Sequence, residues 1–133
     1  MRTNCACTLY NRYVTSGVEY YQRTVLAAVS WQNRKATNVI KSGLLAADSA
    51  VIYIPQSLGT NYLKPLAWQA DRNGSWTLAV GDVIVKGLVT DEITGGFTMT
   101  SLKAKYDDVV VIKSVDTMDG ASPSLCHWQV GAS

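Results

Sequence analysis

Residues 76–88 read WTLAVGDVIVKGL, and this stretch decides the fold that the sequence predicts. Most of its residues are apolar and many are β-branched, which is typical of strands that fill a small sheet. The Gly-Asp pair at residues 81–82 predicts a tight turn, and Gly87 predicts the end of the second strand or a bulge in it. Within residues 83–86, the two valines should face one way and the isoleucine the other. The stretch carries no catalytic group.

The Asn-Gly pair at residues 73–74 predicts a second hairpin immediately before this stretch. Asn-Gly favours a two-residue type I′ turn, because both positions of that turn need a positive φ. Such a hairpin would pair Trp68 with Ala79. Its second strand would turn every other side chain toward the core: Trp76, Leu78 and Val80.

The N-terminal half supplies three further strands. Residues 8–14 (TLYNRYV) are aromatic and β-branched, Ser16-Gly17 predicts a turn, and residues 20–31 (YYQRTVLAAVSW) follow as a long, largely buried strand. A helix over residues 20–31 is the competing interpretation. As a strand, it would present one apolar face made of Val25, Ala27, Val29 and Trp31. Residues 49–54 (SAVIYI) alternate cleanly and stop at Pro55, which cannot donate to a ladder.

Residues 33–48 (NRKATNVIKSGLLAAD) show no strand alternation and separate two of these strands. They indicate a long excursion, flexible or partly helical, that carries three basic residues, Arg34, Lys35 and Lys41. Connections of this length are uncommon inside a compact domain and usually functional or disordered.

The C-terminal half adds one short helix and two strands. Residues 56–65 and 90–96 are loops by composition, and Thr100 could cap a helix over residues 101–106 (SLKAKY). Residues 109–115 and 126–130 are the last two strands. The total of about six to eight short strands predicts a single all-β domain over residues 1–133, a small barrel or sandwich with one long loop and one short helix.

Composition describes a folded chain with few charges. Of 133 residues, 47% are hydrophobic and 17% charged, and the net charge is +2, too small for a protein that binds polyanions by bulk electrostatics. Residues 1–72 carry a net +5 and the rest −3, so copies could meet basic to acidic, unless folding mixes the charges. No apolar run is long enough for a membrane helix or a signal peptide, so no membrane partner is expected.

The sequence contains few residues in arrangements that could catalyse a reaction. His127 is its single histidine, which excludes a two-histidine zinc site within one chain. Cys5 and Cys7 could join His127 or Cys126 at a metal, but adjacent residues on a strand point to opposite faces. No nucleotide, hydrolase or metalloprotease motif occurs, and the three cysteines indicate free thiols. We expect no metal, no cofactor and no catalytic activity.

A nucleic-acid-binding barrel is the alternative of another class. A five-stranded oligonucleotide-binding fold could stack bases on its aromatic residues: Tyr10, Tyr13, Tyr20, Tyr21 and Trp31. These aromatics are not interleaved with a basic stripe. Non-specific contact of the 33–48 excursion with DNA is easier to accept, especially if many copies surround the duplex.

The order of these features resembles the head-closure or stopper proteins of the head–tail junction of tailed bacteriophages. The resembling pattern runs from TLYNRY and YYQRTVLAAVSW through NRKATNVIKSGLLAAD to AVIYIP, then WTLAVGDVIVKG, VVVIKSVD and HWQVG. The chain is also similar to uncharacterised proteins from phage structural gene regions. It departs from the usual stopper in an insertion over residues 90–106.

The resemblance implies a structural virion protein without enzymatic activity. Such a protein is a small β-barrel that forms a homo-oligomeric ring, contacts portal or adaptor and tail proteins, and resides in the neck after assembly in the host cytoplasm. In that family, the connection before the Y-x-P strand can project into the lumen and help retain DNA. Carried onto this sequence, Arg34, Lys35 and Lys41 would face the lumen or its double-stranded DNA. A tail-terminator or tail-tube-associated protein is the alternative within this class.

Overall fold

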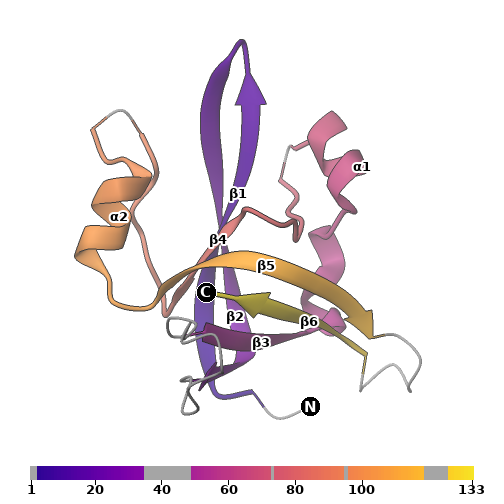
Figure 1. Cartoon of the computed structure of the whole chain (residues 1–133). Coiled ribbons are helices and arrows are strands. Elements are labelled where there is room, and N and C mark those ends of the chain that lie inside the picture. The colour runs from indigo at the N-terminus through magenta and orange to yellow at the C-terminus, as the bar shows by residue number, and fades with distance from the viewer. Residues whose placement is uncertain (1–2, 35–48, 73, 95, 119–125) are drawn as a thin grey trace, which may run out of the picture.

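The fold is a closed antiparallel β-barrel, seen in a computed structural model that describes residues 3–34, 49–72, 74–94, 96–118 and 126–133. The described residues form six strands: β1 Cys5–Thr15, β2 Val18–Arg34, β3 Ser49–Pro55, β4 Val83–Lys86, β5 Val109–Met118 and β6 His127–Ala132. Around the barrel they follow the order β1-β2-β3-β6-β5-β4, and β4 closes the circle by pairing with β1 (Figure 1). The predicted all-β class is confirmed.

The described part of the chain also contains three short helices: η1 Gln56–Asn61, α1 Pro65–Ala70 and α2 Met99–Lys105. Figure 1 shows the long β1–β2 hairpin standing out of the barrel, with α1 on one side of it and α2 on the other. The predicted loop over residues 56–65 therefore contains η1. The predicted short helix is confirmed, but it begins earlier than expected. Thr98, not Thr100, is its N-cap, and the Thr98 side chain accepts a hydrogen bond from the Ser101 N–H.

Strand β4 belongs to two apolar clusters, one on each of its faces. Ile84 points into the main cluster inside the barrel, whereas Val83 and Val85 join a second cluster with Val89 and Leu102 under α2. The alternation predicted from residues 83–86 is thus confirmed. Gly87 ends the strand with a φ of +97°, a conformation that side chains other than glycine rarely adopt.

Residues 76–80 do not form the strand that the sequence predicts. α1 occupies the residues expected to be its partner: Pro65 starts that helix, and the buried Trp68 donates its indole N–H to the Ser75 carbonyl oxygen at 3.1 Å. The pairing of Trp68 with Ala79 is therefore wrong. Proline at the first helical position is pre-organised for a helix, and the burial of the indole secures it.

Part of the predicted core face survives this change. Trp76 and Leu78 are buried, and the Trp76 ring lies edge-on to Trp128 of β6 with centroids 5.6 Å apart. Val80, however, is 69% exposed. It stands in a turn in which the Asp82 N–H donates to the Ala79 carbonyl oxygen. The tight turn is confirmed, one residue earlier than Gly81-Asp82.

A bulge in β2 explains a second difference. The register with β1 passes from Cys7 opposite Leu26 to Cys5 opposite Val29, so β2 has one extra residue there. An extra residue switches the side-chain parity that faces the core. The predicted single face of residues 25–31 is therefore split: Val29 and Trp31 are buried, whereas Val25 and Ala27 are exposed and Leu26 is buried in their place.

Candidate functional site: the projecting arm

The far part of the β1–β2 hairpin, residues 11–23, forms a two-stranded arm (Figure 1). Its tip is a two-residue turn in which Ser16 and Gly17 both have positive φ, 53° and 77°. Turns of this kind match the twist of the flanking strands. β4 pairs with β1 only as far as Tyr10, and β3 pairs with β2 only from Ser30 onward. Among the described strands, none lies beside the arm.

A buried polar network anchors the root of the arm to the turn before β4. Asn11 donates from Nδ2 to Asp82 Oδ2 and to the Thr77 carbonyl oxygen, each at 2.7 Å. Asp82 also accepts the backbone N–H groups of Arg12, at 3.0 Å, and Ala79, at 3.2 Å. Both Asn11 and Asp82 are buried. Burial raises the pKa of Asp82, an effect that the hydrogen bonds from Arg12, Asn11 and Ala79 oppose.

One face of the arm packs on α1 and the segment after it. The Tyr13 ring meets Trp68 edge-on at 5.9 Å, stacks on Tyr20 at 5.4 Å, and carries the Arg72 guanidinium 4.3 Å above its centroid. Gln22 extends from the same face and donates to the carbonyl oxygens of Arg72 and Ser75. These contacts fix the arm against α1.

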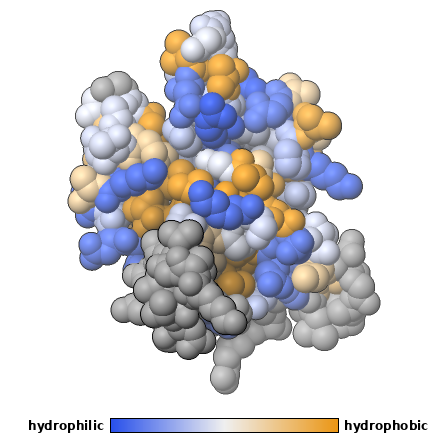
Figure 2. Space-filling model, viewed as in Figure 1, coloured by the Kyte–Doolittle hydropathy of each residue, from blue (hydrophilic) through white to orange (hydrophobic). Residues whose placement is uncertain are grey.

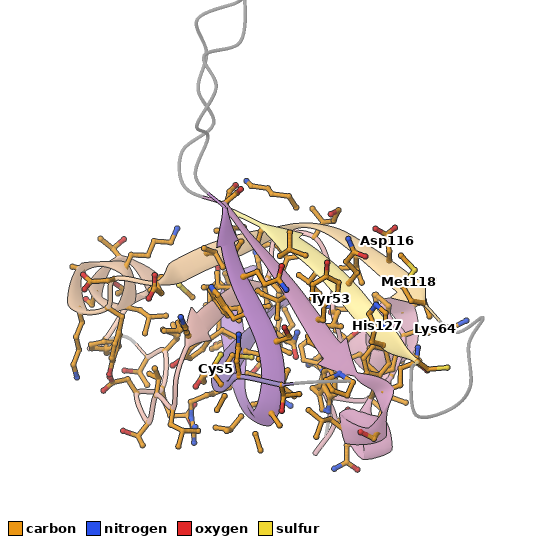
Figure 3. The ribbon with its side chains drawn as sticks, turned by 90° about the horizontal axis from the view of Figure 1, so that it is seen from below. Cys5, Tyr53, Lys64, Asp116, Met118 and His127 are labelled. Carbon is orange, nitrogen blue, oxygen red and sulfur yellow. The ribbon has the colours of Figure 1, made fainter. Side chains whose placement is uncertain are left out.

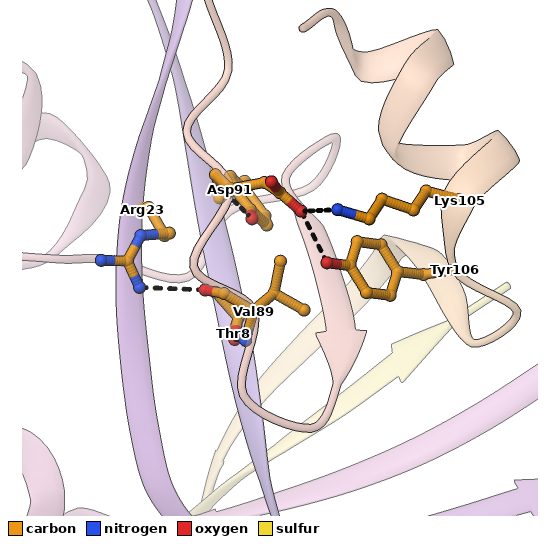
Figure 4. Close-up of polar contacts among 7 residues, drawn as sticks. Thr8, Arg23, Val89, Asp91, Lys105 and Tyr106 are labelled. Atoms are coloured by element: carbon orange, nitrogen blue, oxygen red, sulfur yellow. Dashed lines mark hydrogen bonds and ion pairs between the residues drawn. The ribbon is translucent and has the colours of Figure 1, made fainter.

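The opposite face packs on the segment that leads into α2 (Figure 4). Tyr10 donates its hydroxyl to the Asp91 carbonyl oxygen at 2.7 Å, and Arg23 donates to the Val89 carbonyl oxygen at 3.0 Å. The Asp91 carboxylate accepts hydrogen bonds from Tyr106 and Lys105, which lower its pKa. Burial raises the pKa of Tyr10 to about 12. The arm is therefore held on both faces.

The arm also concentrates exposed apolar surface. Among the described residues, eight large hydrophobic side chains are exposed, and three of them lie on the arm: Val14, Val18 and Tyr20. Val25 lies next along β2 and is also exposed. Apolar side chains are visible at the end of the arm in Figure 2. Val18 and Tyr20 lie on the face toward α1, whereas Val14, opposite Glu19, lies on the other face, so exposed apolar side chains occupy both faces of the arm.

Two grooves follow the β2 side of the arm. The first, of about 410 Å³, is lined by β2 residues 22–27 and, across from them, by Leu58, Asn61 and residues 74–76. The second, of about 490 Å³, lies nearer the tip, between residues 18–20 and Ile93 and Thr94. Both grooves adjoin β2, the first at residues 22–27 and the second at residues 18–20.

Of the three basic residues singled out by the sequence, the structure describes only Arg34. Lys35 and Lys41 lie outside the described residues, as does most of the predicted excursion. Arg34 is the last residue of β2, and its backbone pairs with Ser49, the first residue of β3. The segment between them therefore begins and ends at neighbouring points of the barrel, at the end away from the arm.

The aromatic residues considered for base stacking do not form one exposed face. Tyr10 and Trp31 are buried, in different clusters, and Tyr13 is covered by Trp68 and Arg72. Tyr21 hydrogen-bonds Glu19 on the α2 side, whereas Tyr20 is exposed on the α1 side. Bases could stack there on one ring but not on a row of rings.

The cysteines and the histidine are likewise dispersed. His127 meets Tyr53 of the neighbouring strand edge-on, with ring centroids 5.4 Å apart, and Cys5 lies well away from this pair (Figure 3). Within the described residues, no group of three or more histidine, cysteine or acidic side chains could hold a metal ion, and none of the three cysteines forms a disulfide. Burial raises the pKa of Cys7 to about 12, so its thiol stays protonated.

Sequence reasoning predicted the hairpin but missed the arm. The available signal was strand length: β1 has 11 residues and β2 has 17, whereas β4, which must pair with β1, has 4. Strands of such unequal length cannot be paired along their whole course in one barrel. The anchor Asp82 was taken only as a turn residue, because nothing local in the sequence reveals its burial.

Comparison with known proteins gives the family of the chain. No curated protein and no solved structure matches it. In the described part of the chain, no helix has both the length and the apolar character needed to cross a membrane. Residues 2–133 match a family of unknown function (DUF6751). Because the match covers nearly the whole chain, the protein belongs to the DUF6751 family.

Proposed function

We propose that the protein is a structural virion protein of a tailed bacteriophage, a head-completion or stopper-type head–tail connector. In this role, copies form a homo-oligomeric ring that joins the portal or adaptor to the tail and helps retain packaged DNA. The proposal rests on the resemblance of the strand order to that family. The closed barrel is the scaffold that such a ring requires.

The observation that carries the proposal is the pairing of Arg34 with Ser49. Fourteen residues, including Lys35 and Lys41, connect two strands that are already adjacent, where a tight turn of two to five residues would suffice. The barrel therefore does not need this segment for its own closure. A basic segment whose two ends meet at one point of the barrel suits the lumen-facing role, in which a ring multiplies a small local charge.

Mass measurement on the purified chain tests the ring. Mixed with its portal–adaptor complex, the protein should appear as a closed multimer bound to that complex. A chain that binds neither portal nor adaptor, but binds single-stranded oligonucleotide with a steep salt dependence, would instead be an oligonucleotide-binding barrel.

Charge neutralisation tests the DNA contact. The triple substitution Arg34→Gln, Lys35→Gln and Lys41→Gln should leave ring formation intact and increase DNA loss from tailless heads several-fold. The matched control neutralises three exposed lysines elsewhere: Lys86, Lys103 and Lys113. If both triple variants retain DNA equally well, the segment between β2 and β3 does not hold DNA.

A further inference from the structure

We propose that the outer edge of β2 in the arm pairs antiparallel with the same edge of a second copy of this chain, centred on Tyr21. The contact is two-fold, so it closes after two copies. A ring needs contacts that repeat by rotation, so this inference stands independently of the proposed function. The inference concerns the purified chain, outside any ring.

The first step is the direction of the backbone groups. The Arg12 N–H points away from β2, because it donates to Asp82. Arg12 and its partner Tyr21 are therefore a non-hydrogen-bonded pair, and the N–H and C=O of Tyr21 point to the outer edge of β2. By the same alternation, so do those of Glu19, Arg23 and Val25.

The second step is that only one edge of the arm is free over this length. On the β1 edge, the Arg12 N–H is bonded to Asp82 and its C=O accepts from Gln69 Nε2 at 3.3 Å. On the β2 edge, no described residue hydrogen-bonds the outward groups of residues 19–25, since the ladder with β3 begins only at Ser30. A free edge of this length is a template for another strand.

The third step is charge, which identifies the occupant. Within one chain, Glu19 pairs with Arg12 at 2.8 Å, and Arg23 pairs with Glu92 at 3.1 Å. In a pairing centred on Tyr21, Glu19 of one copy also lies opposite Arg23 of the other, and this opposition occurs twice. Registers centred on Glu19 or on Arg23 would instead place like charges opposite one another, which is unfavourable. The edge is thus self-complementary in one register, as a two-fold contact requires.

The fourth step is the apolar surface beside the edge. Val18 and Tyr20 are 50% and 43% exposed, and Val25 is 41% exposed. In the proposed register, Val18 lies opposite Thr24 of the second copy, Tyr20 opposite Gln22, and Val25 opposite Gly17. The turn of each copy then lies beside the groove that residues 22–27 line in the other. The pairing therefore places Val18, Tyr20 and Val25 beside side chains of the second copy.

Sedimentation of the purified chain at roughly 10–100 μM should show a dimer. Tyr21→Pro removes the central outward N–H, which takes no part in the β1–β2 ladder, and should raise the dimer dissociation constant at least about tenfold. Tyr21→Phe, which keeps that N–H, is the matched variant and should dimerise normally. A chain that stays monomeric, or a dimer unaffected by Tyr21→Pro, would overturn the proposal.

Disulfide trapping tests the register even if Tyr21→Pro disturbs the arm. In a chain with Cys5 and Cys126 replaced by serine, Tyr21→Cys places two sulfurs on residues whose Cα atoms lie about 5.5 Å apart, within disulfide range. Mild oxidation should cross-link it. Val14→Cys is the control, because the two β1 strands lie about 14 Å apart in the four-stranded sheet. Equal cross-linking of both variants would place the contact elsewhere.

Discussion

The substitution Asp82→Ala tests whether the polar network at the root of the arm holds the fold together. Asp82 is 3% exposed and accepts hydrogen bonds from three donors. Leaving a buried donor without its acceptor costs about 1–3 kcal/mol. Asn11 keeps its bond to the Thr77 carbonyl oxygen, so the main losses are at the N–H groups of Arg12 and Ala79.

The net magnitude follows from these losses and one gain. Removing the carboxylate also removes the cost of burying it, which returns about 1 kcal/mol. We expect Asp82→Ala to lower the free energy of unfolding by about 3 kcal/mol, a large share of the roughly 5–15 kcal/mol of a typical domain. Urea denaturation followed by tryptophan fluorescence should show a midpoint lower by roughly 1–2 M.

The pH dependence gives a second readout of the same residue. Because burial raises the pKa of Asp82 in the folded chain, its contribution to stability is greatest below its unfolded pKa of about 4. The contribution falls as the pH rises through the folded value. The loss in Asp82→Ala should therefore be at least as large at pH 3 as at pH 7.

Two variants make the result interpretable. Asp82→Asn should also lower the free energy of unfolding. Its amide N–H₂ group would point at another donor in either orientation: at the N–H of Arg12, or at the donors of Asn11 and Ala79. Asp116→Ala, at an exposed aspartate of β5, should change stability by less than about 0.5 kcal/mol. A loss below about 1 kcal/mol in Asp82→Ala, or a gain in Asp82→Asn, would refute the anchoring role of the network.

Two more predictions concern Tyr10 and Gly131. Since burial raises the pKa of Tyr10 to about 12, its contribution to stability is intact below the unfolded value near 10 and is lost as the pH rises toward 12. Alkaline unfolding should therefore begin in that window, and Tyr10→Phe should weaken this dependence. At Gly131, an added Cβ would lie 2.6 Å from Ser114 Oγ. In urea denaturation, Gly131→Ala should lower the free energy of unfolding by about 1 kcal/mol. In a chain that already carries Ser114→Ala, the same substitution should cause no further loss. Equal losses in both backgrounds would exclude this clash.

Most of the strands could be predicted from the sequence, because their signals are local. Alternating valines and isoleucines define β3, β4 and β5, proline ends β3, and Gly87 ends β4. The helix over residues 65–70 could not be predicted in the same way. The Asn-Gly pair at residues 73–74 favours a hairpin, but Pro65 and the buried indole of Trp68 favour the helix, and the burial of that indole depends on residues distant in sequence, such as Tyr13.

The candidate site also combines features that the local sequence predicts with features that it does not. The sequence predicts a first strand over residues 8–14, the turn at Ser16-Gly17, a long strand over residues 20–31 and the basic segment that follows it. Three features depend on contacts between distant segments: the hairpin extends beyond its neighbouring strands, Asp82 anchors its root, and no described strand pairs with the β2 edge of the arm. The physical reason is that hydrophobic periodicity and turn chemistry act over a few residues. Barrel closure instead depends on which distant strands meet and over what length.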